Sequence, residues 1–119
     1  MIKAHAEATK RFYDDKKFAV DAYVKWDPSQ SRADIERVWD VYSKMGAYER
    51  VPYLAADAVK YVLDHPSDPQ SAAAMKAFDW HTVIDNKIVD KIVKEGFFEK
   101  LYGPSIKAEE DSKSKRAYR

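Results

Sequence analysis

Three histidines are the first candidates for chemistry, because an imidazole can ligate a metal or move a proton near neutral pH. His5, His65 and His81 lie far apart in the sequence. None of them has a second histidine or a carboxylate at ligand spacing on one helical face, which a metal site normally shows. The pattern favours surface or capping roles for the three histidines, and we expect neither a metal site nor a cofactor.

Carboxylates and hydroxyls are the next candidates, as general acids, bases or nucleophiles. The runs Asp14-Asp15 and Glu109-Glu110-Asp111 lie in polar, Lys-rich stretches, so we interpret both as solvated faces with ordinary acidity. No glycine-rich phosphate loop occurs, and no serine lies in a nucleophile elbow. This holds for Ser29, Ser31, Ser43, Ser67 and Ser71. Since no nucleophile, base and orienting group can be assembled from the spacing, we expect no enzymatic activity.

Three tryptophans could line an aromatic cage for a cationic ligand. Trp39 lies on an apolar helical stripe, which favours packing in a core. Trp26 and Trp80 flank aspartates near expected helix ends, and for these two both interpretations stay open.

The composition indicates one globular chain. Of its 119 residues, 45% are hydrophobic and 34% are charged, which is typical of a folded domain. The 21 basic and 20 acidic side chains nearly cancel, so the sequence lacks the basic excess that nucleic acid requires. The absence of cysteine excludes disulfides and thiolate sites. No run of about 18 apolar residues occurs, so we expect no membrane insertion. The N-terminus shows no secretory signal, so as it stands the chain is expected in the cytoplasm.

Helical periodicity recurs along the first half. Residues 2–16 form an Ala-rich pattern with Ile2, Ala6, Thr9 and Phe12 or Tyr13 on one side. Residues 18–26 form a second pattern, for which the inward side chains are predicted to be Val20, Tyr23 and Val24, while the direction of Trp26 is left open. A capping box at Ser31 and Asp34 opens a third helix that ends at Met45-Gly46. Its inward face is predicted to be Ile35, Val38, Trp39 and Tyr42.

The second half continues in the same way. Pro52 is predicted as the first residue of a helix that His65-Pro66 closes. Its buried face is predicted to be Leu54, Ala55, Ala58, Val59, Val62 and Leu63. A brief helix is expected near residues 72–78. We predict an all-α fold: a single compact domain of six or seven short helices at residues 1–104, followed by a polar, charged and solvated or frayed tail at residues 105–119.

The stretch 79–104 organises this prediction. Asp85 is the expected N-cap and Gly96 the expected left-handed C-cap of one short helix. Between them lies an apolar stripe, and a cluster of large side chains follows directly: Phe97, Phe98, Leu101 and Tyr102. Fully burying one such side chain stabilises a fold by roughly 1.5–3 kcal/mol, so the cluster must find a surface on which to pack. We predict that these four residues form part of a homodimer interface. Exchange of the terminal segment between the two chains is one way in which this interface could form.

The motif VIDNKIVDKIVKEGFFEKLYGPSIKAEE, residues 83–110, resembles the C-terminal end of substrate-binding proteins of ABC importers. The similar group is nitrate/sulfonate/taurine-like and includes thiamine-precursor-binding relatives. The segments IKAHAEATKRFYDD and AYVKWDP resemble upstream parts of the same proteins, so the resemblance spans nearly all of the chain.

This resemblance implies a non-catalytic, periplasmic component of a transport system. It also implies that the chain corresponds to the trailing helical part only, without the two α/β lobes and the cleft between them. The ligand contacts of the family lie mostly in those lobes, so no ligand-binding residue is assigned. The implied partners are the missing lobes of the parent protein or a second copy of the chain. The alternative is a stand-alone helical protein–protein interaction module with no role in transport.

Overall fold

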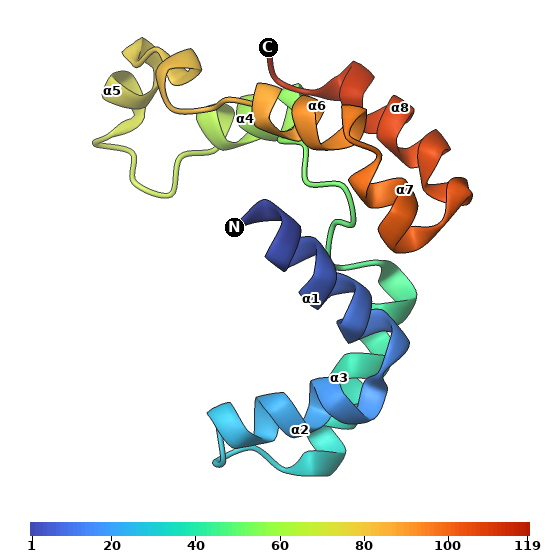
Figure 1. Cartoon of the computed structure of the whole chain (residues 1–119). Helices are drawn as coiled ribbons and strands as arrows, with labels where there is room; N and C mark the ends of the chain where they lie inside the picture. The colour runs from blue at the N-terminus through green and yellow to red at the C-terminus, as the bar shows by residue number, and fades with distance from the viewer. The chain divides into compact units, whose positions relative to one another are not determined.

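The computed structural model describes all residues from 1 to 119, and its regular elements are helices (Figure 1). The predicted all-α class is confirmed, with eight α-helices and two short 3₁₀-helices where six or seven helices were expected. The contacts within the chain divide it into two compact units, Met1–Arg50 and Val51–Arg119.

The first unit contains three helices, α1 (Ile2–Asp14), α2 (Lys16–Trp26) and α3 (Arg32–Met45). The inner side of α1 is the predicted one, since Ala6 and Thr9 are buried. On α2, Val20 is buried, whereas Trp26, whose direction the sequence left open, is 79% exposed and does not turn inward. Trp26 is the last residue of its helix and packs edge-on against Tyr23 instead.

Helix α3 begins and ends where its sequence signals lie. The Ser31 hydroxyl accepts a hydrogen bond from the Asp34 backbone N–H at 3.1 Å, as a capping box requires. At the other end, Gly46 adopts φ +65°, a left-handed conformation that only glycine reaches without strain. Both signals act within four residues, so neighbouring structure is not needed for them.

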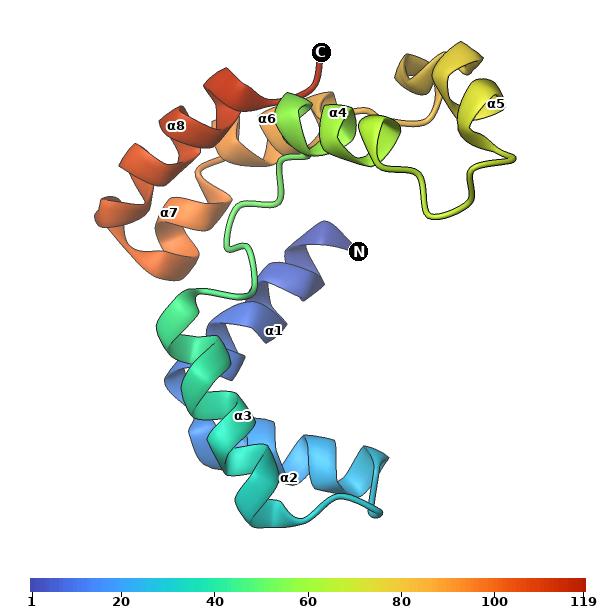
Figure 2. The ribbon, with the colours of Figure 1, turned by 180° about the vertical axis from the view of Figure 1, so that it is seen from behind.

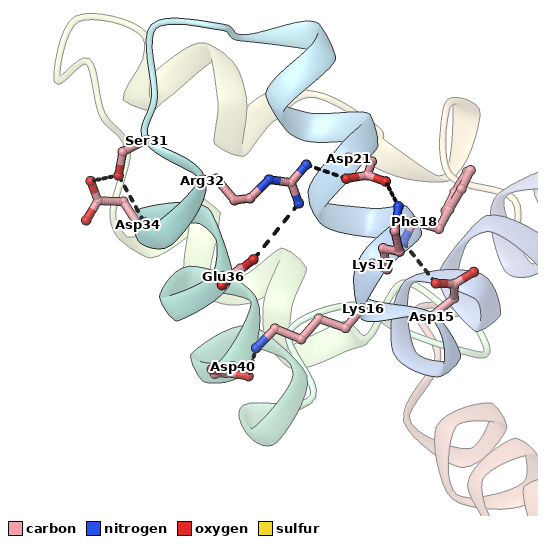
Figure 3. A network of polar contacts seen from close by, with 10 residues as sticks. All are labelled: Asp15, Lys16, Lys17, Phe18, Asp21, Ser31, Arg32, Asp34, Glu36 and Asp40. Carbon is pink, nitrogen blue, oxygen red and sulfur yellow. Dashed lines mark hydrogen bonds and ion pairs between the residues drawn. The ribbon is translucent and has the colours of Figure 1, made fainter.

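Helices α2 and α3 are held together by ion pairs (Figure 3). Lys16 at the start of α2 contacts Asp40 at 2.6 Å, and Asp21 contacts Arg32 at 2.5 Å. The Asp27 carboxylate accepts from Ser29 in the connecting turn, at 3.2 Å from the backbone N–H and 2.6 Å from the hydroxyl. Partly exposed pairs of this kind are worth about 0–1 kcal/mol each, so they orient the two helices more than they stabilise them.

An aromatic cluster joins α1 to α3 and to the end of the first unit. The Trp39 indole N–H donates to the Phe12 carbonyl at 2.8 Å, and the Phe12 ring lies 4.8 Å from the Tyr48 ring. The Tyr13 hydroxyl donates to the Tyr48 carbonyl and accepts from the Tyr48 N–H, each at 2.9 Å. Trp39 therefore has the packing role that its position in the sequence predicted.

The second unit contains α4 (Ala56–Asp64), α5 (Ala72–Ala77), the 3₁₀-helix η1 (Trp80–Thr82), α6 (Lys87–Lys94), α7 (Phe97–Tyr102), the 3₁₀-helix η2 (Pro104–Ile106) and α8 (Lys107–Arg116). Two opposite views show α7 and α8 side by side, with α5 at the far end of the unit from them (Figures 1 and 2). The most deeply buried side chains of this unit are Val51, Phe98, Ile106 and Glu110.

Helix α4 begins later than the sequence indicated. Pro52 lies in an extended segment, and the N-cap is Ala55. The reason is that both backbone groups of Leu54 bond to the distant residues Asn86 and Tyr118, so they are not free to start a helix. Of the predicted buried face, Val59 is buried, whereas Leu54 and Val62 are exposed.

Helix α6 follows the predicted signals closely. The Asp85 carboxylate accepts from the Lys87 N–H at 2.9 Å, although the N-cap position itself belongs to Asn86. Val89 and Ile92 form the buried stripe, and Gly96 follows with φ +68°. Gly96 lets the chain turn directly into α7 with its four large side chains.

The C-terminal stretch was expected to be a solvated or frayed tail, and the structure corrects this. Residues 107–116 form helix α8, with Glu110 2% exposed and Ala117 7% exposed. Sequence patterning missed the helix because its inward face carries Glu110 where an apolar residue would be expected. Long-range contacts of residues 113–119, rather than amphipathicity, hold this segment in place.

The longest helix, α3, has 14 residues. That is fewer than the roughly 20 residues needed to cross a bilayer, and none of the helices meets the criteria for a membrane span.

Candidate functional site

The histidines occupy three separate environments. The His65 ring stacks on Tyr61 at 4.3 Å and its Nδ1 lies 3.0 Å from the Tyr61 carbonyl oxygen. The His81 ring stacks on Tyr118 at 4.5 Å. His5 lines a groove of the first unit. No group of three or more His, Cys, Asp or Glu side chains is arranged to hold a metal ion.

The carboxylates of the two acidic runs lie in different environments, on the surface in the first run and partly in the core in the second. Asp14 pairs with Lys10, and Asp15 caps α2 by accepting from the Phe18 N–H at 2.9 Å. Both are surface roles, as predicted. Glu110 departs from the prediction because its side chain is buried and its Oε1 has no hydrogen-bond partner.

Several serine side chains form local hydrogen bonds at helix ends and turns. Ser31 caps α3, Ser29 closes the turn before it, and the Ser71 hydroxyl donates to the Asp68 carbonyl at 2.9 Å. The Ser43 hydroxyl lies 3.4 Å from the Asp40 carbonyl oxygen, and Ser67 is exposed. Trp80, whose role the sequence left open, donates its indole N–H to the Met75 carbonyl at 2.8 Å.

A polar clamp around Asn86 joins three segments of the second unit. The Asn86 side chain accepts from the Leu54 N–H and donates to the carbonyl oxygens of Leu54 and Tyr118, each at 2.9 Å. The Tyr118 N–H donates to the Leu54 carbonyl at 2.8 Å, and Ala55 and Ala117 form an isolated antiparallel bridge. Asn86 is 6% exposed, so these bonds are shielded from water. The clamp fixes the C-terminal segment to the start of the unit.

A second polar group, Tyr53, Asp90 and Arg119, lies on the same segments. Arg119 holds Asp90 through two N–H groups, at 2.5 and 2.9 Å, and the Tyr53 hydroxyl donates to Asp90 at 2.7 Å. The Arg119 hydrogen bonds lower the pKa of Asp90 to about 2. Burial, with Asp90 adding to it, raises the pKa of Tyr53. Asp90 therefore stays ionised, and its carboxylate oxygens accept hydrogen bonds from Arg119 and Tyr53. This arrangement suits a structural contact between segments better than acid–base chemistry.

Sequence patterning found neither group. The partners of Asn86 are 32 residues away in both directions, and Asp90 and Arg119 are 29 residues apart. The one available signal is the Asp-Asn pair at 85–86, which belongs to the motif that carries the family resemblance.

An apolar groove opens on the second unit between α4 and the segment 80–84. Its volume is about 200 Å³. Val62 at its edge is 52% exposed, and Leu54 is similarly exposed. The lining is Leu54, Ala58, Val59, Val62, Leu63, Trp80 and Ile84. Most of the apolar side chains that were predicted to be buried on α4 therefore line this groove and are not packed in the interior.

The first unit has a groove of about 310 Å³ between α1 and α2. Aromatic rings and small side chains line it, namely His5, Ala8, Thr9, Phe12, Phe18, Ala19, Tyr23 and Tyr48. The Arg11 guanidinium lies 3.4 Å from the centre of the Phe18 ring at this site. On α3, the apolar side chains Val38, Val41, Tyr42 and Met45 are also exposed, although Val38 and Tyr42 were predicted to turn inward.

The four predicted interface residues lie on α7. Phe98 is fully buried within its own chain, while Phe97, Leu101 and Tyr102 are half-buried. Phe98 is therefore not available to a partner that docks on the folded surface, and this part of the predicted interface needs correction. A dimer that uses Phe98 would have to exchange the segment between chains.

Comparison of the chain with protein-family models, with curated proteins and with solved structures finds no match.

Proposed function

We propose that the chain is a non-catalytic helical portion of a solute-binding protein that serves an ABC importer. The solute class is nitrate/sulfonate/taurine-like, as the resemblance of residues 83–110 implies. In this role the helices bind the α/β lobes of the parent protein and take no part in chemistry.

The exposed apolar surface is the observation that carries the proposal. Helices α3 and α4 present large side chains to solvent on the faces that their sequences mark as inward, with Val38 47% and Val62 52% exposed. Several large apolar side chains exposed on one helix are a common mark of a binding surface. Helices that pack on the lobes of a larger protein would leave these faces uncovered when alone.

The structural roles of the motif residues add support. Asn86 is the centre of the buried clamp, Gly96 supplies the left-handed turn between α6 and α7, and Phe98 is completely buried. Residues that carry the resemblance are thus among those that hold the second unit together. This is expected if the motif specifies a structural element and not a ligand contact.

The proposal has consequences for location and partners. A solute-binding protein of this group works in the periplasm, so we place the chain there. Its partners are the lobes of the parent protein, and neither nucleic acid nor a cofactor has a role.

Fragment complementation tests the proposal. The acceptor is a solute-binding protein of this group from which the corresponding C-terminal helices have been removed. We expect the full chain to form a one-to-one complex with the acceptor in sedimentation velocity. Titration calorimetry of the mixture with taurine, an alkanesulfonate or nitrate should then show binding that neither part shows alone.

Two variants of α4 provide the matched control. Val62→Lys puts a charge on the groove and should weaken the complex, whereas Lys60→Gln on the opposite face should leave it unchanged. Lys60 is exposed and pairs with Asp64. If the folded chain forms no complex with such acceptors, the proposal fails. A helical interaction module without a transport role would then be the better description.

A further inference from the structure

Helix α8 buries a carboxylate, Glu110, and the residues that flank the helix, Ile106 and Ala117, are buried and apolar. Ile106, Glu110 and Ala117 are 1%, 2% and 7% exposed. Oε1 of Glu110 has no hydrogen-bond partner, and Oε2 lies 3.7 Å from the Lys107 ammonium. A buried carboxylate is costly to ionise unless donors compensate it, and here one oxygen has none.

The charges around Glu110 do not remove this cost. Lys107 on α8 favours the ionised form, while Asp111 on α8 and Glu99 on α7 oppose it. The pKa of Glu110 is raised above its ordinary value of 4.5, with burial as the largest cause. The next cation on this side of the helix, Lys113, is occupied by Glu109 at 2.8 Å and by the Val51 carbonyl at 3.3 Å.

The other attachments of α8 lie toward its C-terminal end. Lys113 donates to Val51, Arg116 pairs with Asp57 at 2.8 Å, and Arg119 holds Asp90. The N-terminal half of the helix, by contrast, depends on the burial of Ile106 and Glu110. Loss of packing at Glu110 would therefore act on the half of the helix that lies away from these three attachments.

We infer that α8 is a pH-sensitive element, which packs tightly while the Glu110 carboxyl group is protonated and loosens at its N-terminal half when that group ionises. The sign follows from linkage. Because protonation is favoured in the packed state, packing is strongest below pH 4.5 and weakens as the pH rises through the raised pKa. The contact between Asp90 and Arg119 limits the stability of the C-terminal segment in acid, since it is lost only as the pH falls toward 2.

Hydrogen exchange of the α8 amides tests this inference in the full chain. Exchange is measured at pH 4.5, 6.0 and 7.5, with correction for the intrinsic exchange rates. The protection factors of the α8 amides should fall with rising pH. The total fall should be up to about tenfold for each pH unit by which the pKa of Glu110 in the packed state exceeds its ordinary value of 4.5. In Glu110→Gln, which keeps the shape and removes the charge, protection should stay nearly constant over this range.

Two controls separate other causes. Asp111→Asn removes an exposed carboxylate on the same helix and should keep the pH dependence, with its midpoint moved to lower pH because Asp111 opposes the ionisation of Glu110. The His81 ring stacks on Tyr118 close to the end of α8, so His81→Gln tests this contact and should leave the pH dependence in place. Titration of the Glu110 carboxyl ¹³C shift in the unsubstituted chain gives a readout that needs no variant. Equal pH dependence in Glu110→Gln and the unsubstituted chain, or a carboxyl midpoint at or below 4.5, overturns the inference.

Discussion

Asn86 satisfies both backbone hydrogen-bonding groups of Leu54, accepting from its N–H and donating to its carbonyl oxygen, each at 2.9 Å. The Asn86 side-chain amide thus provides Leu54 with the backbone hydrogen bonds that a neighbouring β-strand would otherwise provide. Its second donor bond, to the Tyr118 carbonyl, brings the C-terminal segment to the same place. Because Asn86 is buried, none of these three bonds can be replaced by water without opening the structure.

Replacing Asn86 by Asp should destabilise the second unit by about 1–3 kcal/mol, because it removes two donor bonds and buries a charge. Urea unfolding followed by circular dichroism measures the change. The matched control is Gln70→Glu, an equivalent substitution at an exposed residue, which should change stability little. A stable Asn86→Asp variant would show that the clamp is incidental to the fold.

The contact between Asp90 and Arg119 should make stability fall in strong acid. The pKa of Asp90 is depressed to about 2 from its ordinary 3.8, so its contribution is complete above pH 3.8 and is lost as the pH falls toward 2. Asp90→Asn should lower the free energy of unfolding at pH 5 and flatten its slope between pH 4 and 2. Equal slopes for Asp90→Asn and the unsubstituted chain would contradict this.

The chain by itself should not bind nitrate, alkanesulfonates or taurine with micromolar affinity, since the lobes that carry the ligand contacts in the family are implied to be elsewhere. Thermal unfolding is a sensitive measurement, because ligand at 100 times its Kd would add about 2.7 kcal/mol of stability. A saturable rise in Tm with any of these solutes would place a complete site on this chain.

Self-association through α7 is predicted to give about twice the chain mass of 13.8 kDa in light scattering. Because Phe98 is buried, the dimer should form by exchange of the terminal segment, and Phe98→Asp should yield monomer or aggregate. Phe78→Asp, at a phenylalanine that is 47% exposed, is the control and should keep the dimer. A single-chain mass at high concentration would rule the dimer out.

Several features were determined by the sequence alone because their causes lie within one helical turn. Ser31 and Asp34 start α3, and Gly46 and Gly96 end α3 and α6 in left-handed conformations. Each of these is a local hydrogen bond or a local steric preference, so nearby residues suffice to predict it. The all-α class followed from the same local rules.

The tertiary structure decided what depends on distant partners. Pro52 does not start a helix, because Leu54 bonds to Asn86 and Tyr118. Residues 107–116 form a helix despite their polarity, because the residues near its end bond to Val51, Asp57 and Asp90. Periodicity correctly marked apolar faces on α3 and α4, but it could not tell which of them the chain would cover. Burial depends on which surfaces meet, and that is set by packing between segments far apart in the sequence.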